Sequence, residues 1–152
     1  MLVRAVEDPG ERSDLCRHVL EALPAWFGIE AAVRQYIRGV ATLPTFAVDR
    51  DAFLSLKLHT AAAAEIHVMG VLPERQGQGA GTALVQAAEE FLRRREVEYL
   101  QVKTLGPSRP STHYTRTRRF YESRGFRPLE ELTAIWGEEN PCLIMVKRIA
   151  AG

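Results

Sequence analysis

The chain of 152 residues contains only two cysteines, Cys16 and Cys142, which lie far apart in the sequence. Two such residues cannot form a disulfide framework and lack the spacing of zinc ligands, so we expect buried thiols and no metal site. No apolar run approaches the ~20 residues that a transmembrane helix needs. The N-terminal residues are followed at once by charged ones, so the sequence does not predict a secretory signal. A cytoplasmic protein that binds no membrane is expected.

The sequence also lacks an excess of either charge, since its formal net charge is only +1. General attraction to nucleic acid is therefore not expected, and no aromatic platform accompanies the basic residues. Arginines are nonetheless concentrated between residues 109 and 127, where Glu122 is the single acid. They are Arg109, Arg116, Arg118, Arg119, Arg124 and Arg127. This stretch indicates either a solvated helix face or a local anion site.

The length suits one domain, which we assign to residues 1–152. Hydrophobic periodicity and turn residues define its elements. Strands are expected at 2–6, 45–48, 53–58, 63–71, 98–103, 126–132 and 142–149, and helices at 15–23, 29–40, 82–95 and 114–124. They predict an α/β (α+β) fold with a mixed central sheet of about six to seven strands, in which a strand–helix–strand unit supplies a parallel pair, and about four helices. Glu89 and Glu90 should pair with Arg93 and Arg94 on the solvated side of their helix.

The most informative segment is Gln76-Gly77-Gln78-Gly79-Ala80-Gly81, which joins a predicted strand to a predicted helix. Glycines permit positive φ and a close approach of a ligand to the main chain. A helix that begins there directs unpaired N–H groups into the turn, which favours phosphate binding. A P-loop is excluded because Gly81 is followed by Thr82-Ala83 rather than by Lys-Ser or Lys-Thr, and the glycine spacing does not fit a dinucleotide fingerprint.

Two motifs together resemble the GNAT superfamily of acyl-CoA-dependent N-acyltransferases. The pattern Gln76-x-x-Gly79-x-Gly81 is similar to the pyrophosphate-binding motif of that superfamily, and Arg119-Phe120-Tyr121-Glu122-Ser123-Arg124-Gly125-Phe126 is similar to its FYxxxGF signature. The order of the predicted elements agrees over essentially the whole chain. The sequence departs from the pattern at Tyr114 and Thr117, where the superfamily often has an Asn and a small residue. The contact of that Asn with the CoA arm would fall to the tyrosine hydroxyl or to a neighbouring arginine.

The resemblance implies that acetyl-CoA binds between two diverging parallel strands and that no metal takes part. The strand main chain at 69–71 would bind the pantetheine amides, and the glycine turn would hold the pyrophosphate. The expected cofactor-binding residues are Met69, Gly70, Val71, Gln76, Gly77, Gln78, Gly79, Ala80, Gly81 and Thr82. Gly70 fits either a β-bulge at the point of divergence or tight packing against a helix.

Tyr121 matches the tyrosine of the superfamily that donates to the leaving sulfur. Strand alternation puts Glu65, His67 and Met69 on one face of their strand. Glu65 resembles the glutamate base of histone-acetyltransferase-like members, whereas His67 lies nearer the point of divergence and has a suitable intrinsic pKa. The base is therefore Glu65, His67 or water. The other histidines, His18, His59 and His113, have no comparable placement.

Trp26 and Phe27 lie at the corner between the first two helices, where they would either wall an amine pocket or pack beneath the helices. Trp136 is a second wall or an ordinary hairpin aromatic. The expected function is N-acetyl transfer from acetyl-CoA to a primary amine, small molecule or peptide, by direct attack in a ternary complex. The alternatives are a non-catalytic acyl-CoA-binding module and an acetyltransferase of protein lysines or N-termini. The sequence leaves the oligomeric state open, with a homodimer as one option.

Overall fold

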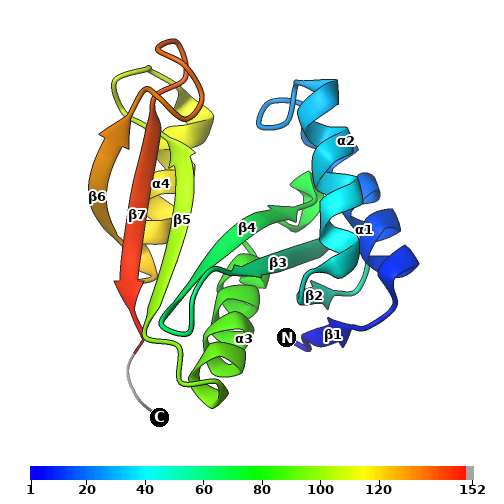
Figure 1. Ribbon diagram of the computed structural model, residues 1–152. Coiled ribbons are helices and arrows are strands. Elements are labelled where there is room, and N and C mark those ends of the chain that lie inside the picture. The colour runs from blue at the N-terminus through cyan, green and yellow to red at the C-terminus, as the bar shows by residue number, and fades with distance from the viewer. Residues whose placement is uncertain (150–152) are drawn as a thin grey trace.

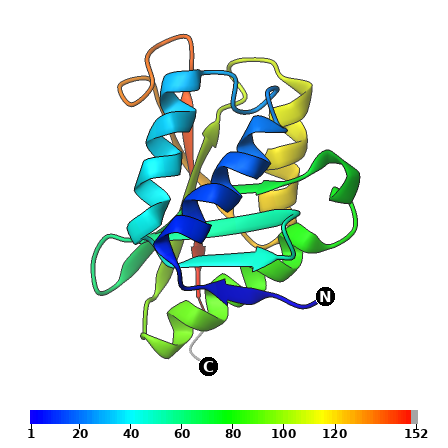
Figure 2. The same cartoon turned by 90° about the vertical axis from the view of Figure 1, so that its right-hand side faces the viewer.

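The computed structural model describes residues 1–149 as one seven-stranded sheet with helices on both faces (Figures 1 and 2). The strands are β1 (Arg4–Val6), β2 (Thr45–Val48), β3 (Ala52–Leu58), β4 (Ala63–Val71), β5 (Tyr99–Leu105), β6 (Arg127–Leu132) and β7 (Cys142–Arg148). The helices are α1 (Pro9–Glu21), α2 (Glu30–Gly39), α3 (Ala80–Arg94) and α4 (Thr112–Ser123), with 3-10 turns at Val40–Thr42 and Pro73–Arg75. The predicted fold class is confirmed; residues 150–152 of the predicted domain lie outside the described residues.

The strands are arranged in the order β1-β2-β3-β4-β5-β7-β6. Neighbouring strands are antiparallel except β4 and β5, which are parallel and are connected through α3. The predicted parallel pair is thus confirmed. Because the connection of a parallel pair must cross one face of the sheet, α3 packs against the strands that it joins. The N-terminus of α3 therefore lies close after the C-terminal end of β4.

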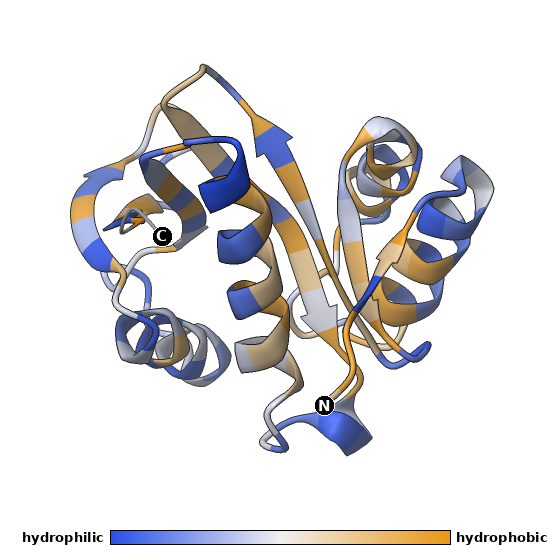
Figure 3. Ribbon diagram, turned by 90° about the horizontal axis from the view of Figure 1, so that it is seen from below, coloured by the Kyte–Doolittle hydropathy of each residue, from blue (hydrophilic) through white to orange (hydrophobic). Residues whose placement is uncertain are grey.

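The two faces of the sheet carry separate hydrophobic cores. Phe46 and Leu54 belong to the core beneath α3 and α4, whereas their neighbours Ala47 and Phe53 belong to the core beneath α1 and α2. This division follows from the alternation of side chains along a strand. Figure 3 shows orange residues alternating with paler or blue ones along the strands, and both colours on the helices, as amphipathic elements require.

An ion pair between Lys147 of β7 and Glu89 of α3 joins the sheet to its helices. The ammonium group of Lys147 also donates to the carbonyl oxygen of Arg124, at 2.7 Å, beyond the end of α4. The side chain of Glu89 is only 6% exposed. The prediction that Glu89 lies on the solvated side of α3 is therefore wrong, because a cation on a distant strand balances its charge inside the core. Glu90 is on the solvated side and pairs with Arg94 as predicted.

We expect Lys147→Met to lower the free energy of unfolding by about 3–5 kcal/mol, because it leaves the Glu89 carboxylate buried without its partner. The double variant Lys147→Met/Glu89→Met removes both charges and should recover most of this loss. Chemical denaturation of the two variants and the parent measures the difference. Equal losses in the single and double variants would contradict the assignment of the cost to an unpaired buried charge.

Candidate active site

The central feature of the site is the divergence of β4 from β5 (Figure 1). The parallel ladder runs from Ala63 opposite Tyr99 to Ile66 opposite Val102 and ends there. β4 continues to Val71 with β3 paired along its other edge. Within the described residues, the last part of β4 therefore has a strand partner on one side only. Its main chain on the β5 side is available to a ligand that binds as an added strand.

A β-bulge lies at His67, where this divergence begins. Ser55 of β3 pairs with Val68 and the next residue, Leu56, pairs with Ile66, so His67 is the extra residue of β4. An inserted residue shifts the alternation of the side chains that follow it. Val68 accordingly joins the core of α1 and α2, whereas Met69 packs against the core of α3 and α4. The prediction that Met69 shares a face with Glu65 and His67 is wrong for this reason.

Gly70 has a packing role and does not form the bulge. A Cβ atom at this position would lie 2.8 Å from Val19 Cγ1 and 3.1 Å from Leu23 Cδ1, so α1 crosses the strand too closely for a larger residue. Of the two roles that the sequence left open for Gly70, tight helix packing is the one that the structure supports. The bulge and the close helix approach are neighbouring but separate features of β4.

The turn before α3 leaves its backbone open. Gly77 and Gly79 have φ of +76° and +95°, in the left-handed region that favours glycine, and no atom lies within 4 Å of an added Cβ at either position. Gly79 is the N-cap of α3 and provides no side-chain acceptor for the first amides of the helix. None of the hydrogen bonds of the described residues outside helices and strands uses the N–H groups of residues 77–82. These amides and the positive end of the helix dipole make the turn a candidate anion site.

The side chains of the turn hold its shape. Gln76 Nε2 donates to the carbonyl oxygen of Val71 at 3.0 Å, and Gln78 Nε2 donates to the carbonyl oxygen of Glu74 at 2.9 Å. Arg75 pairs with Asp51 at the β2–β3 hairpin. Both glutamines are thus turned back toward the preceding segment, which leaves the N–H groups as the exposed donors of the turn.

At Gly81, a neighbouring side chain excludes a larger residue. An added Cβ at Gly81 would lie 3.1 Å from Cζ of Phe120, so α3 and α4 approach each other closely at this point. Phe120 is the first aromatic residue of the second motif. The two motifs of the sequence therefore meet in space, and the contact fixes α4 beside the turn.

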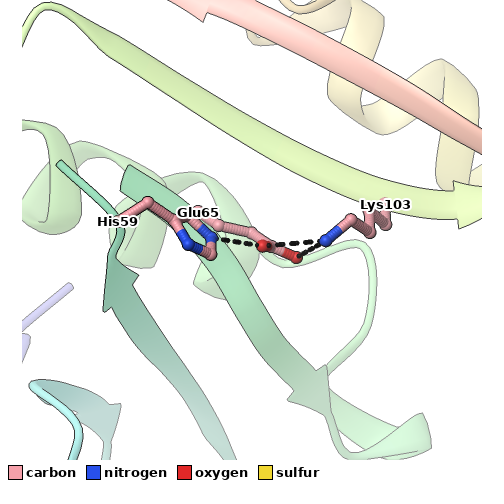
Figure 4. A network of polar contacts seen from close by, with 3 residues as sticks. All are labelled: His59, Glu65 and Lys103. Carbon is pink, nitrogen blue, oxygen red and sulfur yellow. Dashed lines mark hydrogen bonds and ion pairs between the residues drawn. The ribbon is translucent and has the colours of Figure 1, made fainter. Parts of the chain in front are cut away.

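A buried carboxylate, that of Glu65, lies between two basic side chains (Figure 4). Glu65 is 5% exposed. Its Oε1 accepts a hydrogen bond from His59 Nε2 at 2.7 Å, and Lys103 Nζ of β5 lies 3.2 Å from Oε1 and 3.4 Å from Oε2. Neither His59 nor Lys103 was assigned a role from the sequence, because only the pairing register of β3, β4 and β5 brings them to Glu65.

His67 lies on the same face of the sheet as Glu65, half-buried, with its ring 5.3 Å from the ring of Tyr36 in an edge-to-face arrangement. Burial lowers the pKa of His67, an effect that the charge of Glu65 partly opposes. Burial, together with the negative charge of Glu65, raises the pKa of Tyr36. The imidazole of His67 is therefore neutral near pH 7 and able to accept a proton.

Tyr121 lies on the buried side of α4, 5% exposed, between the rings of Phe120 and Phe126. Burial raises its pKa, so the phenol stays protonated at neutral pH. Its two ring neighbours offer no polar group, and its hydroxyl has no hydrogen-bond partner among residues 1–149. A protonated hydroxyl without a protein partner is free to donate to a ligand.

The aromatic residues predicted at the acceptor side, Trp26, Phe27 and Trp136, have different surroundings. Phe27 packs edge-to-face on Tyr36 with ring centroids 6.1 Å apart, which extends a row of rings to His67. Trp26 contacts His113 and Thr117 of α4, whereas Trp136 is 41% exposed in the β6–β7 connection. Trp26 and Phe27 both pack against the core of α1 and α2 and are only partly buried. The structure thus supports a packing role for each and leaves part of each ring accessible.

Two negative observations concern residues 1–149. No group of three or more His, Cys, Asp or Glu side chains in this part of the chain is arranged to hold a metal ion. No helix there combines the length and the apolar character that a membrane span requires.

An open helix N-terminus beside a diverging parallel pair of strands is an arrangement that suits an extended ligand carrying phosphate. The model of the acetyltransferase (GNAT) domain family matches residues 31–128, which is more than half of the chain. The chain therefore belongs to the GNAT acetyltransferase family, as the two motifs indicate. Its glycine turn and the whole of its FYxxxGF-like motif both lie inside the matched segment.

Three similar proteins illustrate the family. A mycothiol acetyltransferase from Beutenbergia cavernae is 39% identical over 74 residues, which are 49% of this chain but only 23% of that protein. The structure of a Desulfovibrio desulfuricans protein assigned to the GNAT family superimposes with a TM-score of 0.80 and 21% identity over 98% of this chain and 99% of that one. The structure of an aminoglycoside 6'-N-acetyltransferase with coenzyme A has a TM-score of 0.74 and 18% identity over 99% and 98%.

We expect His67 to titrate below the ordinary histidine pKa of 6.5, because burial disfavours the imidazolium ion. The folded chain then binds fewer protons at this site than the unfolded chain. The contribution of neutral His67 to the stability of the fold is therefore complete above pH 6.5. This contribution is lost as the pH falls through 6.5 toward the lower pKa of the folded state. NMR titration of the His67 Cε1–H signal, assigned with His67→Asn, measures the midpoint. A midpoint at or above 6.5 would contradict the prediction.

Proposed function

We propose that this protein is an N-acetyltransferase that transfers the acetyl group of acetyl-CoA to a primary amine. The observation that carries the proposal is the set of open amides at residues 77–82, which follows the end of β4, the strand that diverges from β5. Pyrophosphate is the part of CoA that such amides suit, and pantetheine amides suit the one-sided edge at 69–71. Acetyl-CoA supplies the thioester when it is bound.

The amine attacks directly in a ternary complex, without an acyl-enzyme. Both cysteines are buried, and burial raises the pKa of Cys16 to about 12 and also raises the pKa of Cys142. Since the thiolate is the reactive form, neither cysteine is suited to accept the acetyl group. This supports a one-step transfer over a covalent route.

His67 is the base that we propose among the three alternatives. Its lowered pKa keeps the imidazole neutral near pH 7, and its position at the bulge is where the strands begin to separate. Glu65 is less suited, because its carboxylate is buried and already accepts from His59 and Lys103. We propose that Glu65 instead stabilises the positive charge that forms on His67. Tyr121 would donate its proton to the departing sulfur.

The acceptor is a primary amine whose identity the family does not fix. One relative carries mycothiol in its name and another an aminoglycoside. The small share of the mycothiol acetyltransferase that this chain matches gives no basis for adopting that substrate. The protein could also act on a peptide amine, so peptides belong in any test of the acceptor.

The first test is free-thiol release from acetyl-CoA across a panel of amines that includes polyamines, aminoglycosides, amino acids and peptides. The parent protein should bind acetyl-CoA in calorimetry, and Gly79→Glu should abolish binding because a carboxylate then enters the anion site. Thermal unfolding of the variant checks that the fold survives. Normal acetyl-CoA binding by a folded Gly79→Glu variant would refute the proposed cofactor site.

Loss of the proton-transfer groups should slow turnover without weakening the binding of acetyl-CoA. We expect Tyr121→Phe and His67→Gln each to lower kcat by about 10²–10⁴-fold, the range typical of general acid–base groups. His67→Gln should also flatten the rising limb of the pH–rate profile. If both variants keep the parent rate and profile, solvent moves the protons; if no amine releases thiol from the parent, the protein only binds acyl-CoA.

A further inference from the structure

Trp26, in the segment between α1 and α2, contacts the first two turns of α4. Tyr114 Oη donates to the Trp26 carbonyl oxygen at 2.9 Å, and Trp26 Nε1 donates to Thr117 Oγ1 at 3.2 Å. The rings of Trp26 and His113 pack edge-to-face with centroids 4.7 Å apart. We call this set, Trp26 with His113, Tyr114 and Thr117, the Trp26 junction. Trp26 is about 90 residues away in sequence from the three α4 residues, and the contacts join segments from the two sides of the strand divergence.

Every polar group of Trp26 has a partner. Its backbone N–H donates to the Leu23 carbonyl oxygen at 3.1 Å, and its other two groups use Tyr114 and Thr117. The Thr117 hydroxyl donates its proton to the His113 carbonyl oxygen at 3.1 Å, so it is left with lone pairs that accept from the indole. Such a fully satisfied set fixes the indole in one orientation.

The junction shares a helix face with the candidate acid of the reaction. Tyr114, Thr117 and Tyr121 are spaced by three and four residues, which places them on one side of α4. The segment that carries Trp26 continues to Phe27, whose ring begins the row that ends at His67. One face of α4 therefore sets the position of Tyr121 and of the segment that leads to the proposed base.

We propose that Tyr114 and Thr117 are positioning residues that hold Trp26 as a fixed wall on the acceptor side. This inference rests on the proposed function. It also gives a role to the departure at these two positions: the Tyr114 hydroxyl serves the α1–α2 segment and does not replace the asparagine contact with CoA. The choice of amine is then set in part by the helix that carries the acid.

The test uses Tyr114→Phe/Thr117→Val in a Trp136→Phe background, where Trp26 is the only tryptophan. Thr117→Ser, which keeps the hydroxyl, and Arg116→Gln, an exposed change on the same helix, are the matched controls. We expect the double variant to red-shift Trp26 emission and raise its quenching by acrylamide. The KM for the best amine of the panel should rise about tenfold, as for the loss of one to two hydrogen bonds, with the Kd of acetyl-CoA within about twofold of the parent. Both controls should match the parent.

Two results would overturn the proposal. One is a Trp26 emission unchanged in the double variant, and the other is an acetyl-CoA Kd weakened about tenfold with an unaltered amine KM, which would return Tyr114 to the cofactor. Failure of the parent itself to bind acetyl-CoA would instead refute the proposed function. In that case the emission of Trp26 still decides whether Tyr114 and Thr117 hold it.

Discussion

The end of the parallel ladder between Ile66 and Val102 is the constraint on which the rest of the site depends. Two strands that separate inside a sheet leave main-chain groups without partners, and such groups are costly to bury. A bulge at His67 places the separation at one position and turns β4 away from β5. The same bulge sends Met69 toward α3 and leaves Glu65 and His67 on the opposite face. One inserted residue thus places Met69 on one face of the sheet and the two candidate bases on the other.

On both faces of the sheet, a buried carboxylate forms an ion pair with a lysine. Glu65 is balanced by Lys103 on the α1–α2 face, and Glu89 by Lys147 on the α3–α4 face. Each of these two ion pairs links elements that are distant in sequence, so each helps to define how the elements are placed around the divergence. Pairs of this kind add little net stability but penalise arrangements in which either charge is left alone. In this fold they fix the register of β4 against β5 and the position of α3 against β7.

The sequence predicted the features that depend on local chemistry. The limits of β4 at Ala63–Val71, the open turn at Gly77 and Gly79 and the parallel pair were all readable from alternation, glycine spacing and element order. The errors at Met69 and Glu89 have a common cause, because both depend on a neighbour that is distant in sequence. A bulge is defined against the opposite strand, and a buried carboxylate is defined by its partner. The contacts of His59 and Lys103 with Glu65 follow from strand register, which a single sequence does not specify.

The same contrast between local motifs and long-range contacts applies to the two parts of the proposed site, the one for acetyl-CoA and the one for the amine. Recognition of a pyrophosphate by backbone amides needs only a short run of small residues in one conformation, so a local motif is enough to reveal it. The proposed acceptor side, formed by Trp26, Phe27, Tyr36 and α4, depends on side chains from three segments that only the fold brings together, so no local motif describes it. The FYxxxGF-like helix belongs to both halves, since Phe120 packs on Gly81 beside the anion site while Tyr114 and Thr117 hold Trp26. The two proposals together therefore predict that changes along one helix alter the choice of amine while the proposed donor site stays intact.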